Sequence, residues 1–497
     1  MTTCDARGMG RRVPDACRVM SQKLFSLSAF GYALLILLAC VSTARAQTDD
    51  IPRKLPDGYD RSLKAAGIPS SASAVVVEPL GITGLRVAYN AKVPMSPAST
   101  MKLVTTYAAL RMLGPAWTWR TDVFLLGARE NGVVLGDLAI RGMGDPRLVI
   151  EQLWLLVERI RGLGIREIRG DLVLDKSAFV PLKHDPEAFD GSGLRTYNVG
   201  PDALLLNYKS TMFSFVPEPD TRTARVIVIP AMAGMKISQT IKASDGACGD
   251  WQGKLRADFS IPLAPVFRGA FPLSCGERNW NVGLLDHTAY FGEVFRALWQ
   301  KSGGVWTGRV RDGAVTPNAV LIATHESPAL AEVVRDINKY SNNVMAQQVF
   351  LTIGAQRFGV PASFSLSSDA VHIFMLENGL DIPELVLENG AGLSRIERIS
   401  AGHLAAMLEN AFQSPAMPEF LASLPLVGVD GTARRRKGAA GYAHIKTGML
   451  NDVRAIAGYV LAESGKRYVL VALINHPNAG AAQLAHDALL EWVYREG

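Results

Sequence analysis

The stretch YAHIKTGMLNDVRAIAGYVLAESGKRYVLVALI, residues 442–474, decides the fold of this chain. Three strand-like runs lie within it, at 442–448, 455–462 and 467–474. Only a few residues separate one run from the next, and connections this short join antiparallel neighbours. The stretch therefore predicts a three-stranded antiparallel meander. An amphipathic segment from about 479 to 494 follows and carries little positive charge, so we expect a helix that packs on the sheet.

Strand and helix signals also stand near the N-terminal end of the chain. The Val-rich run 72–80 and the run 85–89 read as paired strands around a turn that contains glycine. The segment 100–113 is apolar almost all round, begins just after a proline and ends at Gly114-Pro115, which predicts a buried helix. Helical periodicity returns later, at 288–301, 329–350 and 401–412. These elements indicate a mixed α/β chain.

The region between them, from about Trp117 to Cys275, has a different character. Short β-like runs alternate there with Gly and Pro, and one helix-like stretch lies at 148–163. It contains neither an internal repeat nor a phosphate-binding glycine loop. We therefore predict an inserted, mostly β region. At 497 residues and 48% hydrophobic, the chain is too large for one core, and two or three domains are expected.

Residues 1–46 have the pattern of a cleavable signal peptide. Basic residues precede an apolar run at 33–39, and Ala-Arg-Ala at 44–46 fits a small-x-small cleavage site. The apolar run is too short to span a bilayer, and no later stretch is long and apolar enough to be a membrane helix. We expect an exported, periplasmic protein without an integral membrane domain after cleavage. Residues 37–40 also resemble a lipoprotein acylation site, so a lipid anchor on Cys40 stays open.

The formal net charge of +6 is concentrated in this leader, which holds six basic and two acidic side chains. The rest of the chain is left with about +2, which is near neutral, so a nucleic-acid partner is not expected.

Outside the leader only two cysteines remain, Cys248 and Cys275. Two cysteines close in sequence in an exported protein favour one disulfide, and two free buried thiols are the alternative. No histidine pair lies nearby at metal-ligand spacing. We expect neither a metal nor another cofactor.

A serine and a lysine one helical turn apart stand at the start of the predicted helix 100–113. Ser99-Thr100-Met101-Lys102 places a hydroxyl and an amine on neighbouring positions of one helix face. The N-terminal end of a helix stabilises negative charge, and a serine nucleophile needs a base within hydrogen-bond reach. Lys102 can be that base when burial or a nearby cation keeps it neutral. Chance supplies about one such spacing in a chain of this size, so an N-cap serine beside a solvated lysine is the alternative.

Two further motifs carry hydroxyl, amide and amine groups. Ser341-Asn342-Asn343 is the only Ser-x-Asn in the sequence, and Lys446-Thr447-Gly448 lies on the first strand of the meander. On a strand Lys446 and Gly448 face one way, and the glycine lets a peptide pair closely with the strand edge. Lys301-Ser302-Gly303 fits the same pattern but reads as a helix C-cap. Taken singly, a polar helix start and an ordinary strand end explain both motifs.

Together, the order Ser-x-x-Lys, Ser-x-Asn and Lys-Thr-Gly resembles that of penicillin-recognising serine enzymes. The chain resembles their class C low-molecular-mass branch, the D-alanyl-D-alanine carboxypeptidase/endopeptidase penicillin-binding proteins. A long insertion between Ser99 and Ser341 is typical of that branch. The block at 389–395 is similar to its Asp-Gly-Ser-Gly-Leu-Ser-Arg, with departures at Asn389 and Ala391, and 428–432 matches its Gly-x-Asp-Gly-Thr.

This resemblance implies a transpeptidase-like α/β domain in which helices pack against an antiparallel sheet built from N- and C-terminal strands. The catalytic domain would comprise 47–113 and 284–497. The insertion, 114–283, would form two smaller domains, an outer one at 114–128 and 205–283 and a nested one at 129–204.

The resemblance also implies a serine-type D-Ala-D-Ala carboxypeptidase that acts on peptidoglycan stem peptides in cell-wall remodelling. Ser99 would attack the carbonyl of the penultimate D-Ala, Lys102 would take its proton, and water would hydrolyse the acyl-enzyme. β-Lactam antibiotics would acylate Ser99 and act as covalent inhibitors.

The remaining roles implied by the resemblance fall on the second and third motifs. Ser341, helped by Lys339 and Lys446, would pass a proton to the departing amine, and Asn343 would hold the substrate amide. Lys446 and Thr447 would bind the terminal carboxylate beside Gly448. The backbone N–H groups of Ser99 and Met449 would form the oxyanion hole. Arg395 would contact the peptide stem, with a structural ion pair as the alternative.

Two rival classes stay open on the sequence, a β-lactamase or esterase with the same motifs and a non-catalytic wall-binding protein. A class A β-lactamase needs Glu-x-x-Leu-Asn, but Ala203 and Thr447 stand where the glutamate should precede the two Leu-Asn pairs. Neither a HExxH zinc motif nor a Gly-x-Ser-x-Gly elbow occurs. The sequence leaves open the balance of carboxypeptidase and endopeptidase activity, the diamino acid of the stem and the oligomeric state.

Overall fold

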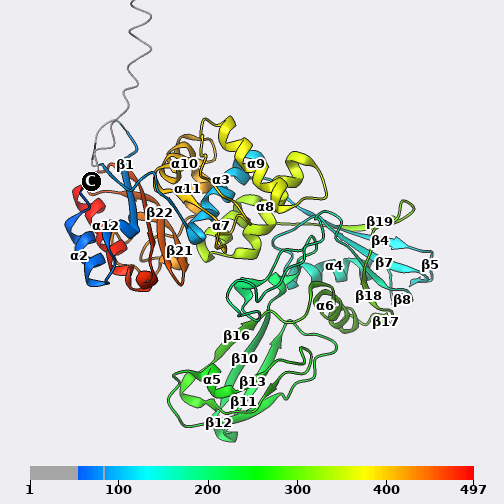
Figure 1. Ribbon diagram of the computed structural model, residues 1–497. Helices are drawn as coiled ribbons and strands as arrows, with labels where there is room; N and C mark the ends of the chain where they lie inside the picture. The colour runs from blue at the N-terminus through cyan, green and yellow to red at the C-terminus, as the bar shows by residue number, and fades with distance from the viewer. Residues whose placement is uncertain (1–53, 82–83, 85) are drawn as a thin grey trace, which may run out of the picture. The chain divides into compact units, whose positions relative to one another are not determined.

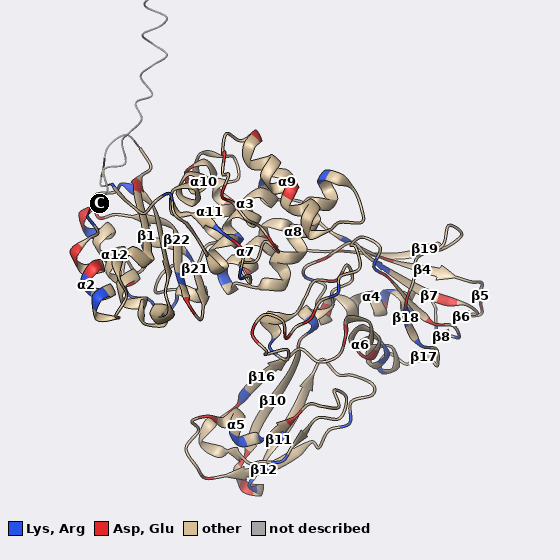
Figure 2. Ribbon diagram, viewed as in Figure 1, with Lys and Arg blue, Asp and Glu red and all other residues tan. Residues whose placement is uncertain are grey.

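The computed structural model describes residues 54–81, 84 and 86–497. The signal peptide expected at 1–46, with its lipid-anchor alternative, lies outside the described residues. In the part of the chain that the structure describes, no helix is long and apolar enough to cross a membrane. Figure 2 shows basic and acidic residues interspersed over the described ribbon, in keeping with the near-neutral charge of the chain after residue 46.

A five-stranded antiparallel sheet in the order β2-β1-β23-β22-β21 joins the two ends of the chain. Its strands are β1 (Ser73–Pro79), β2 (Val87–Tyr89), β21 (Ala443–Leu450), β22 (Val453–Leu461) and β23 (Arg467–Asn475). β21, β22 and β23 pair in sequence order through short turns, so the predicted meander is confirmed. β1 pairs with β23 along its whole length, which brings the N-terminal strand into the same sheet.

Side chains of β1 alternate between the two faces of this sheet, and helices cover both faces (Figure 1). Val75 and Val77 belong to one core, with α2 (Asp57–Ala65) and α12 (Gln483–Glu496). Ala74 and Val76 belong to the core on the opposite face. The helices of that core are α3 (Lys102–Met112), α7 (Leu330–Tyr340), α8 (Asn343–Phe358), α9 (Phe364–Glu377), α10 (Ala401–Gln413) and α11 (Met417–Ser423). A two-stranded ribbon, β3 (Pro94–Met95) with β20 (Ile399–Ser400), adjoins them.

A second, mixed sheet has the order β18-β9-β7-β4-β19. Its strands are β4 (Arg120–Leu126), β7 (Asp137–Gly142), β9 (Leu172–Asp175), β18 (Val310–Asp312) and β19 (Val320–Glu326). β7, β9 and β18 run parallel to one another. α4 (Ile150–Gly162) and α6 (His287–Lys301) share a core with this sheet. A small sheet accompanies it, made of β5 (Arg129–Glu130), β6 (Val133–Val134), β8 (Glu167–Ile168) and β17 (Val305–Trp306).

Residues 211–282 form a third unit with its own aromatic core. Its sheet has the order β15-β12-β11-β10-β16. The strands are β10 (Thr211–Glu218), β11 (Thr223–Ile229), β12 (Thr240–Ser244), β15 (Phe271–Pro272) and β16 (Arg278–Val282), with α5 (Trp251–Leu255) and the hairpin of β13 (Ala257–Asp258) and β14 (Val266–Phe267) between them. Cys248 and Cys275 form a disulfide here, with their Cα atoms 4.8 Å apart, which is the pairing that the sequence favours.

Strand pairing differs from the domain boundaries predicted for the insertion. β18 and β19 come after residue 283, yet they extend the sheet of β4, β7 and β9. The helical periodicity at 288–301 suggests a return to the catalytic domain, but α6 packs in the core that contains α4. Residues 211–282 have a separate aromatic core, although Met232 packs in the core of α4 and α6, and strand pairing favours a nesting that is the reverse of the prediction. We propose an inserted region from 114 to 326, with 211–282 nested within it.

Candidate active site

Ser99 lies in a short 3-10 turn, η2 (Ala98–Met101), that leads directly into α3. Lys102 is the first residue of α3, and its side chain is completely buried. Its Nζ donates a hydrogen bond to Ser99 Oγ at 3.1 Å. The i, i+3 spacing of the first motif puts both groups on one helix face, and the structure brings them into direct contact.

Two further acceptors surround the Lys102 amine. Nζ donates to Asn343 Oδ1 at 2.6 Å and to the carbonyl oxygen of Ala391. Burial lowers the pKa of Lys102 to about 7, although the negative charge of Glu397 acts in the opposite direction. Near neutral pH a large fraction of this lysine is therefore the free amine, the form that a general base requires.

Two glycines allow other parts of the chain to approach η2 closely. A Cβ on Gly448 of β21 would lie 2.7 Å from the carbonyl oxygen of Pro97, and one on Gly392 would lie 1.9 Å from that of Ala98. Ala98 itself has a φ of 45°, a left-handed conformation that costs free energy in a residue other than glycine. The turn that carries Ser99 is thus held between β21 and the 389–395 loop. Gly448 is therefore required for the packing of η2 against β21, a role that the sequence alone does not reveal.

A second hydroxyl–amine pair lies close to the first. Ser341 connects α7 to α8 in a left-handed conformation, with a φ of 58°. Lys446 of β21 is completely buried, and its Nζ donates to Ser341 Oγ and to the carbonyl oxygen of Thr447, each at 2.8 Å. Burial, and then the charge of Lys102, lower the pKa of Lys446 well below its ordinary value.

β21 is an edge strand of its sheet, and its outer edge is only partly covered. Segment 425–427 pairs with the first part of that edge, and the last such backbone bond runs from Ile445 N to the Pro425 carbonyl oxygen. Beyond Ile445, no strand or bridge of the described residues pairs with the outer edge of β21. Thr447 and Met449 therefore lie where an extended peptide can add to the sheet. The Thr447 Oγ1 donates a hydrogen bond to Thr432 Oγ1 at 2.8 Å.

Lys339 and Arg395 are not brought into this cluster by direct contacts. Lys339 Nζ pairs with Asp430 Oδ2 at 2.6 Å, and this ion pair ties α7 to the 428–432 block. Arg395 is half-exposed, with a guanidinium nitrogen 3.5 Å from Asp452 Oδ1. Its guanidinium also lies over the ring of Phe189, 4.4 Å from the centroid. Arg395 therefore has an ion-pair partner in the structure, Asp452, as the alternative interpretation of this residue requires.

Two groups at the site are missed by sequence reasoning. Glu397 is 1% exposed, and burial raises its pKa. Its Oε1 accepts hydrogen bonds from three backbone N–H groups at 2.9 to 3.1 Å, those of Glu388, Asn389 and Gly390. These bonds hold the turn that presents the Ala391 carbonyl to Lys102. Its only sequence signal is an acidic residue two positions after the 389–395 block. The carbonyl oxygen of Tyr197, in η3 (Thr196–Asn198), accepts from Asn343 Nδ2 at 3.0 Å, and a backbone contact has no sequence signal.

The site holds a helix-start serine bonded to a buried lysine of lowered pKa, with a second serine–lysine pair and an open strand edge nearby. This is the arrangement expected of a serine enzyme of acyl transfer, in which a lysine can serve as the base. Among the described residues no group of three or more metal-ligating side chains occurs. The sequence profile of the peptidase S13 family, D-Ala-D-Ala carboxypeptidase 3, matches residues 59–495. The chain belongs to this family and is a serine-type D-Ala-D-Ala carboxypeptidase, as the resemblance of its motifs predicts.

Known relatives and solved structures agree with this assignment. D-alanyl-D-alanine carboxypeptidase DacB of Haemophilus influenzae is 26% identical over an alignment of 475 positions, which covers 92% of this chain and 95% of the relative. The crystal structure of penicillin binding protein 4 (dacB) from the same organism aligns with a TM-score of 0.73 and 22% identity, over 89% of this chain and 100% of that chain. Its complex with a β-lactam aligns with a TM-score of 0.69 and 22% identity, over 88% and 100%. The predicted fold, helices on an antiparallel sheet with an insertion, is confirmed.

Proposed function

We propose that Ser99 attacks the carbonyl carbon of the penultimate D-Ala of a peptidoglycan stem peptide. Neutral Lys102 takes the hydroxyl proton as the new C–O bond forms. The observation that carries this proposal is the 3.1 Å contact between Lys102 Nζ and Ser99 Oγ, made by a fully buried lysine with a pKa of about 7. The peptide bond then breaks, and the acyl group stays on Ser99 as an ester.

The terminal D-Ala leaves as an amine and needs a proton. Ser341 Oγ supplies it, and Lys446, whose Nζ is 2.8 Å away, replaces it. Lys446 and Thr447 bind the terminal carboxylate at the uncovered part of the β21 edge. The backbone N–H groups of Ser99 and Met449 stabilise the oxyanion, and removing one such donor costs about a hundredfold or more in comparable enzymes.

Asn343 has two tasks in this scheme. Its Oδ1 accepts from Lys102 and its Nδ2 donates to the Tyr197 carbonyl, so it positions the base. An amide nitrogen has two protons, and the second one is left for the substrate amide. Gly448 keeps η2 close to β21, Lys339 holds the 428–432 block through Asp430, and Arg395 contacts the peptide stem from the half-exposed 389–395 loop.

Water hydrolyses the ester and frees Ser99 for another cycle. β-Lactams acylate Ser99 by the same attack, because their strained amide presents an equivalent carbonyl. The β-lactam complex of the Haemophilus influenzae protein supports this part of the proposal. A cross-linked stem offers the same D-Ala carbonyl with a side-chain amine as the leaving group, so we propose DD-endopeptidase activity as well. The expected site of action is the periplasm, which cell fractionation tests.

The experiment compares wild type, Ser99→Ala and the matched surface variant Ser464→Ala on a pentapeptide and on a cross-linked muropeptide. We expect release of D-Ala from the pentapeptide, cleavage of the cross-link, and a covalent adduct with fluorescent penicillin in wild type and Ser464→Ala. Ser99→Ala should lose all three. Unchanged activity in Ser99→Ala would overturn the proposal. Rapid turnover of a chromogenic cephalosporin would favour a β-lactamase, and absence of both D-Ala release and adduct would favour a wall-binding protein.

A further inference from the structure

A cavity of about 650 Å³ lies in the inserted region. It opens where the parallel strands β9 and β18 end, at Asp175 and Asp312, and where α6 begins, at His287. In open α/β sheets, the crevice at the carboxyl ends of parallel strands is where ligands bind. The volume lies within the range of small-molecule sites. None of the residues assigned above to Ser99 chemistry lines this cavity.

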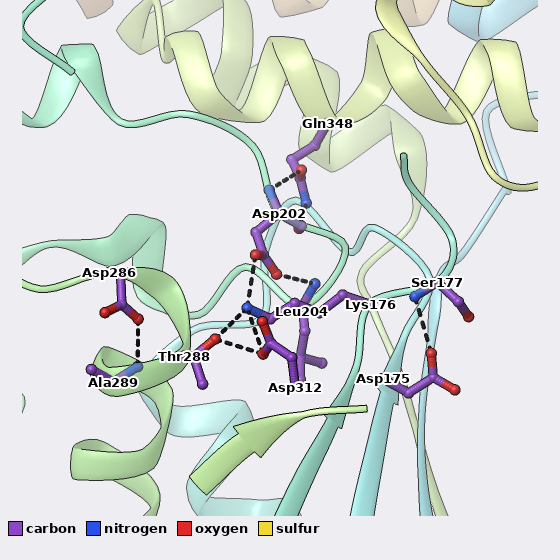
Figure 3. Close-up of polar contacts among 10 residues, drawn as sticks. All are labelled: Asp175, Lys176, Ser177, Asp202, Leu204, Asp286, Thr288, Ala289, Asp312 and Gln348. Carbon is purple, nitrogen blue, oxygen red and sulfur yellow. Dashed lines mark hydrogen bonds and ion pairs between the residues drawn. The ribbon is translucent and has the colours of Figure 1, made fainter. Parts of the chain in front are cut away.

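One charged wall of the cavity is neutralised by its own contacts (Figure 3). Lys176 Nζ lies 3.1 Å from Asp202 Oδ2 and 3.2 Å from Asp312 Oδ1, and it donates to Thr288 Oγ1 at 2.7 Å. Asp175 accepts backbone N–H bonds from Ser177 at 3.0 Å and from Val315 at 2.8 Å. These groups satisfy one another, so they do not require a ligand.

Lys209, on another part of the wall, has no such partner. It is 8% exposed, yet its ammonium makes no hydrogen bond or ion pair with any residue in the described part of the chain. Burial lowers its pKa, while the charges of Asp286 and Asp202 act in the opposite direction. Asp286 is engaged as the N-cap of α6, where it accepts from Ala289 N at 2.8 Å, and Asp202 is engaged by Lys176. Lys209 lines the cavity and its Nζ is not among the fully buried polar atoms, so the ammonium is accessible to a ligand that enters the cavity.

The backbone around Lys209 is strained. Asn207, Tyr208 and Lys209 form η4 (Asn207–Lys209), and all three have positive φ values, of 47°, 55° and 49°. Residues other than glycine adopt this conformation rarely, and strain of this kind gathers at ligand sites. The turn thus places on the cavity wall a lysine that has no direct hydrogen-bond acceptor.

The other lining groups indicate what lies against that cation. Phe179, Val180, Pro181 and Pro361 give the cavity an apolar side. We propose that the cavity is a second binding site, which takes an aliphatic amino acid or a short peptide with its carboxylate paired to Lys209 and its aliphatic part against these apolar residues. A carboxylate supplies the direct acceptor atoms that Lys209 lacks. The sources with this chemistry are a free amino acid, such as the D-alanine released by the enzyme, and the end of a stem peptide.

Titration calorimetry at pH 7 tests the site, with D-alanine and a stem tetrapeptide as probes. The protein is first acylated with penicillin, so that the Ser99 site is filled, and the adduct is verified by mass spectrometry. We expect saturable binding of at least one probe, weakened at least about tenfold in Lys209→Met because a charge-assisted hydrogen bond is lost. Binding of D-alanine assigns the free amino acid, and binding of the tetrapeptide alone assigns the peptide end.

Lys183→Met is the matched control. Lys183 is exposed and lies on segment 176–186, which borders the cavity, but it does not itself line the cavity. It should bind like wild type, and normal penicillin acylation of Lys209→Met shows that this variant is folded. The proposal fails if neither probe binds, or if the probe that binds wild type binds Lys209→Met as tightly. Absence of a penicillin adduct would instead count against the function proposed for Ser99. The titration is then run on untreated protein, where the effect of Lys209→Met still decides the second site.

Discussion

Acylation of Ser99 should slow down steeply as the pH falls below 7, because only the neutral form of Lys102 can take the serine proton. With a pKa of about 7, Lys102 is about half neutral at pH 7 and about one-tenth neutral at pH 6. The rate constant for acylation by penicillin should therefore fall about tenfold for each pH unit below that pKa. An ordinary solvated lysine, with a pKa of about 10.4, would instead give a rate that keeps rising about tenfold per pH unit through this range and does not level off above pH 7.

Glu397→Gln should move this acid limb to lower pH. The charge of Glu397 raises the pKa of Lys102, so its removal leaves burial to lower that pKa further. A glutamine oxygen can still accept the backbone N–H bonds that Glu397 Oε1 accepts now, so the loop geometry is retained. Glu388→Gln is the matched control, because Glu388 is exposed on the same loop and its side chain makes no contact with the base.

The assay follows the second-order rate constant for labelling by a fluorescent penicillin from pH 5 to pH 9, with circular dichroism to show that each variant is folded. A purely structural role for Glu397 would lower the rate at every pH without moving the limb. A flat wild-type profile between pH 5.5 and pH 8 would refute Lys102 as the base. An unmoved limb in folded Glu397→Gln would refute the electrostatic part of the argument.

Three more outcomes follow from the contacts. Gly448→Ala puts a Cβ 2.7 Å from the Pro97 carbonyl oxygen, so η2 must shift; we expect a loss of about 1–3 kcal/mol in stability and at least about tenfold slower penicillin labelling. Replacing Cys248 and Cys275 by serine should cost about 3.5 kcal/mol, from the 27-residue separation of the two cysteines, measured by denaturant unfolding. Penicillin labelling should continue in that variant. Lys102→Met should abolish labelling yet raise the midpoint of thermal unfolding at pH 7. The pKa of Lys102 is lower in the folded than in the unfolded protein, so this lysine lowers the stability of the fold increasingly as the pH falls from about 10.5 to about 7.

Local patterns were sufficient to predict the parts of the fold that depend on neighbours in sequence. The meander of β21, β22 and β23 follows from three apolar runs joined by short turns, and each strand pairs with the next. The contact of Lys102 with Ser99 follows from their spacing on one helix. The disulfide is predicted from the expected export of the chain and from the presence of only two cysteines after residue 46.

Pairings between distant segments could not be predicted in this way. β18 has three residues, and its partner β9 is more than 130 residues earlier, so nothing in its own sequence identifies the sheet that it joins. The same limit applies to the site. Glu397 acts through backbone N–H groups, and Lys339 is held by Asp430 from a different block, so residue type alone does not show which of them lies near the substrate.

The two buried lysines suggest how the proposed proton transfers are coupled in time. When Lys102 accepts the proton of Ser99, it becomes a cation, and the charge of Lys102 lowers the pKa of Lys446. Lys446 therefore gives up a proton most readily when the leaving amine needs one, and Ser341 Oγ, 2.8 Å from its Nζ, lies on the path. A positive charge on both lysines in one dry site is unfavourable, so proton gain by the base promotes proton loss by the acid. This coupling requires both lysines to be away from water, and both are completely buried in the structure although lysines are usually solvated.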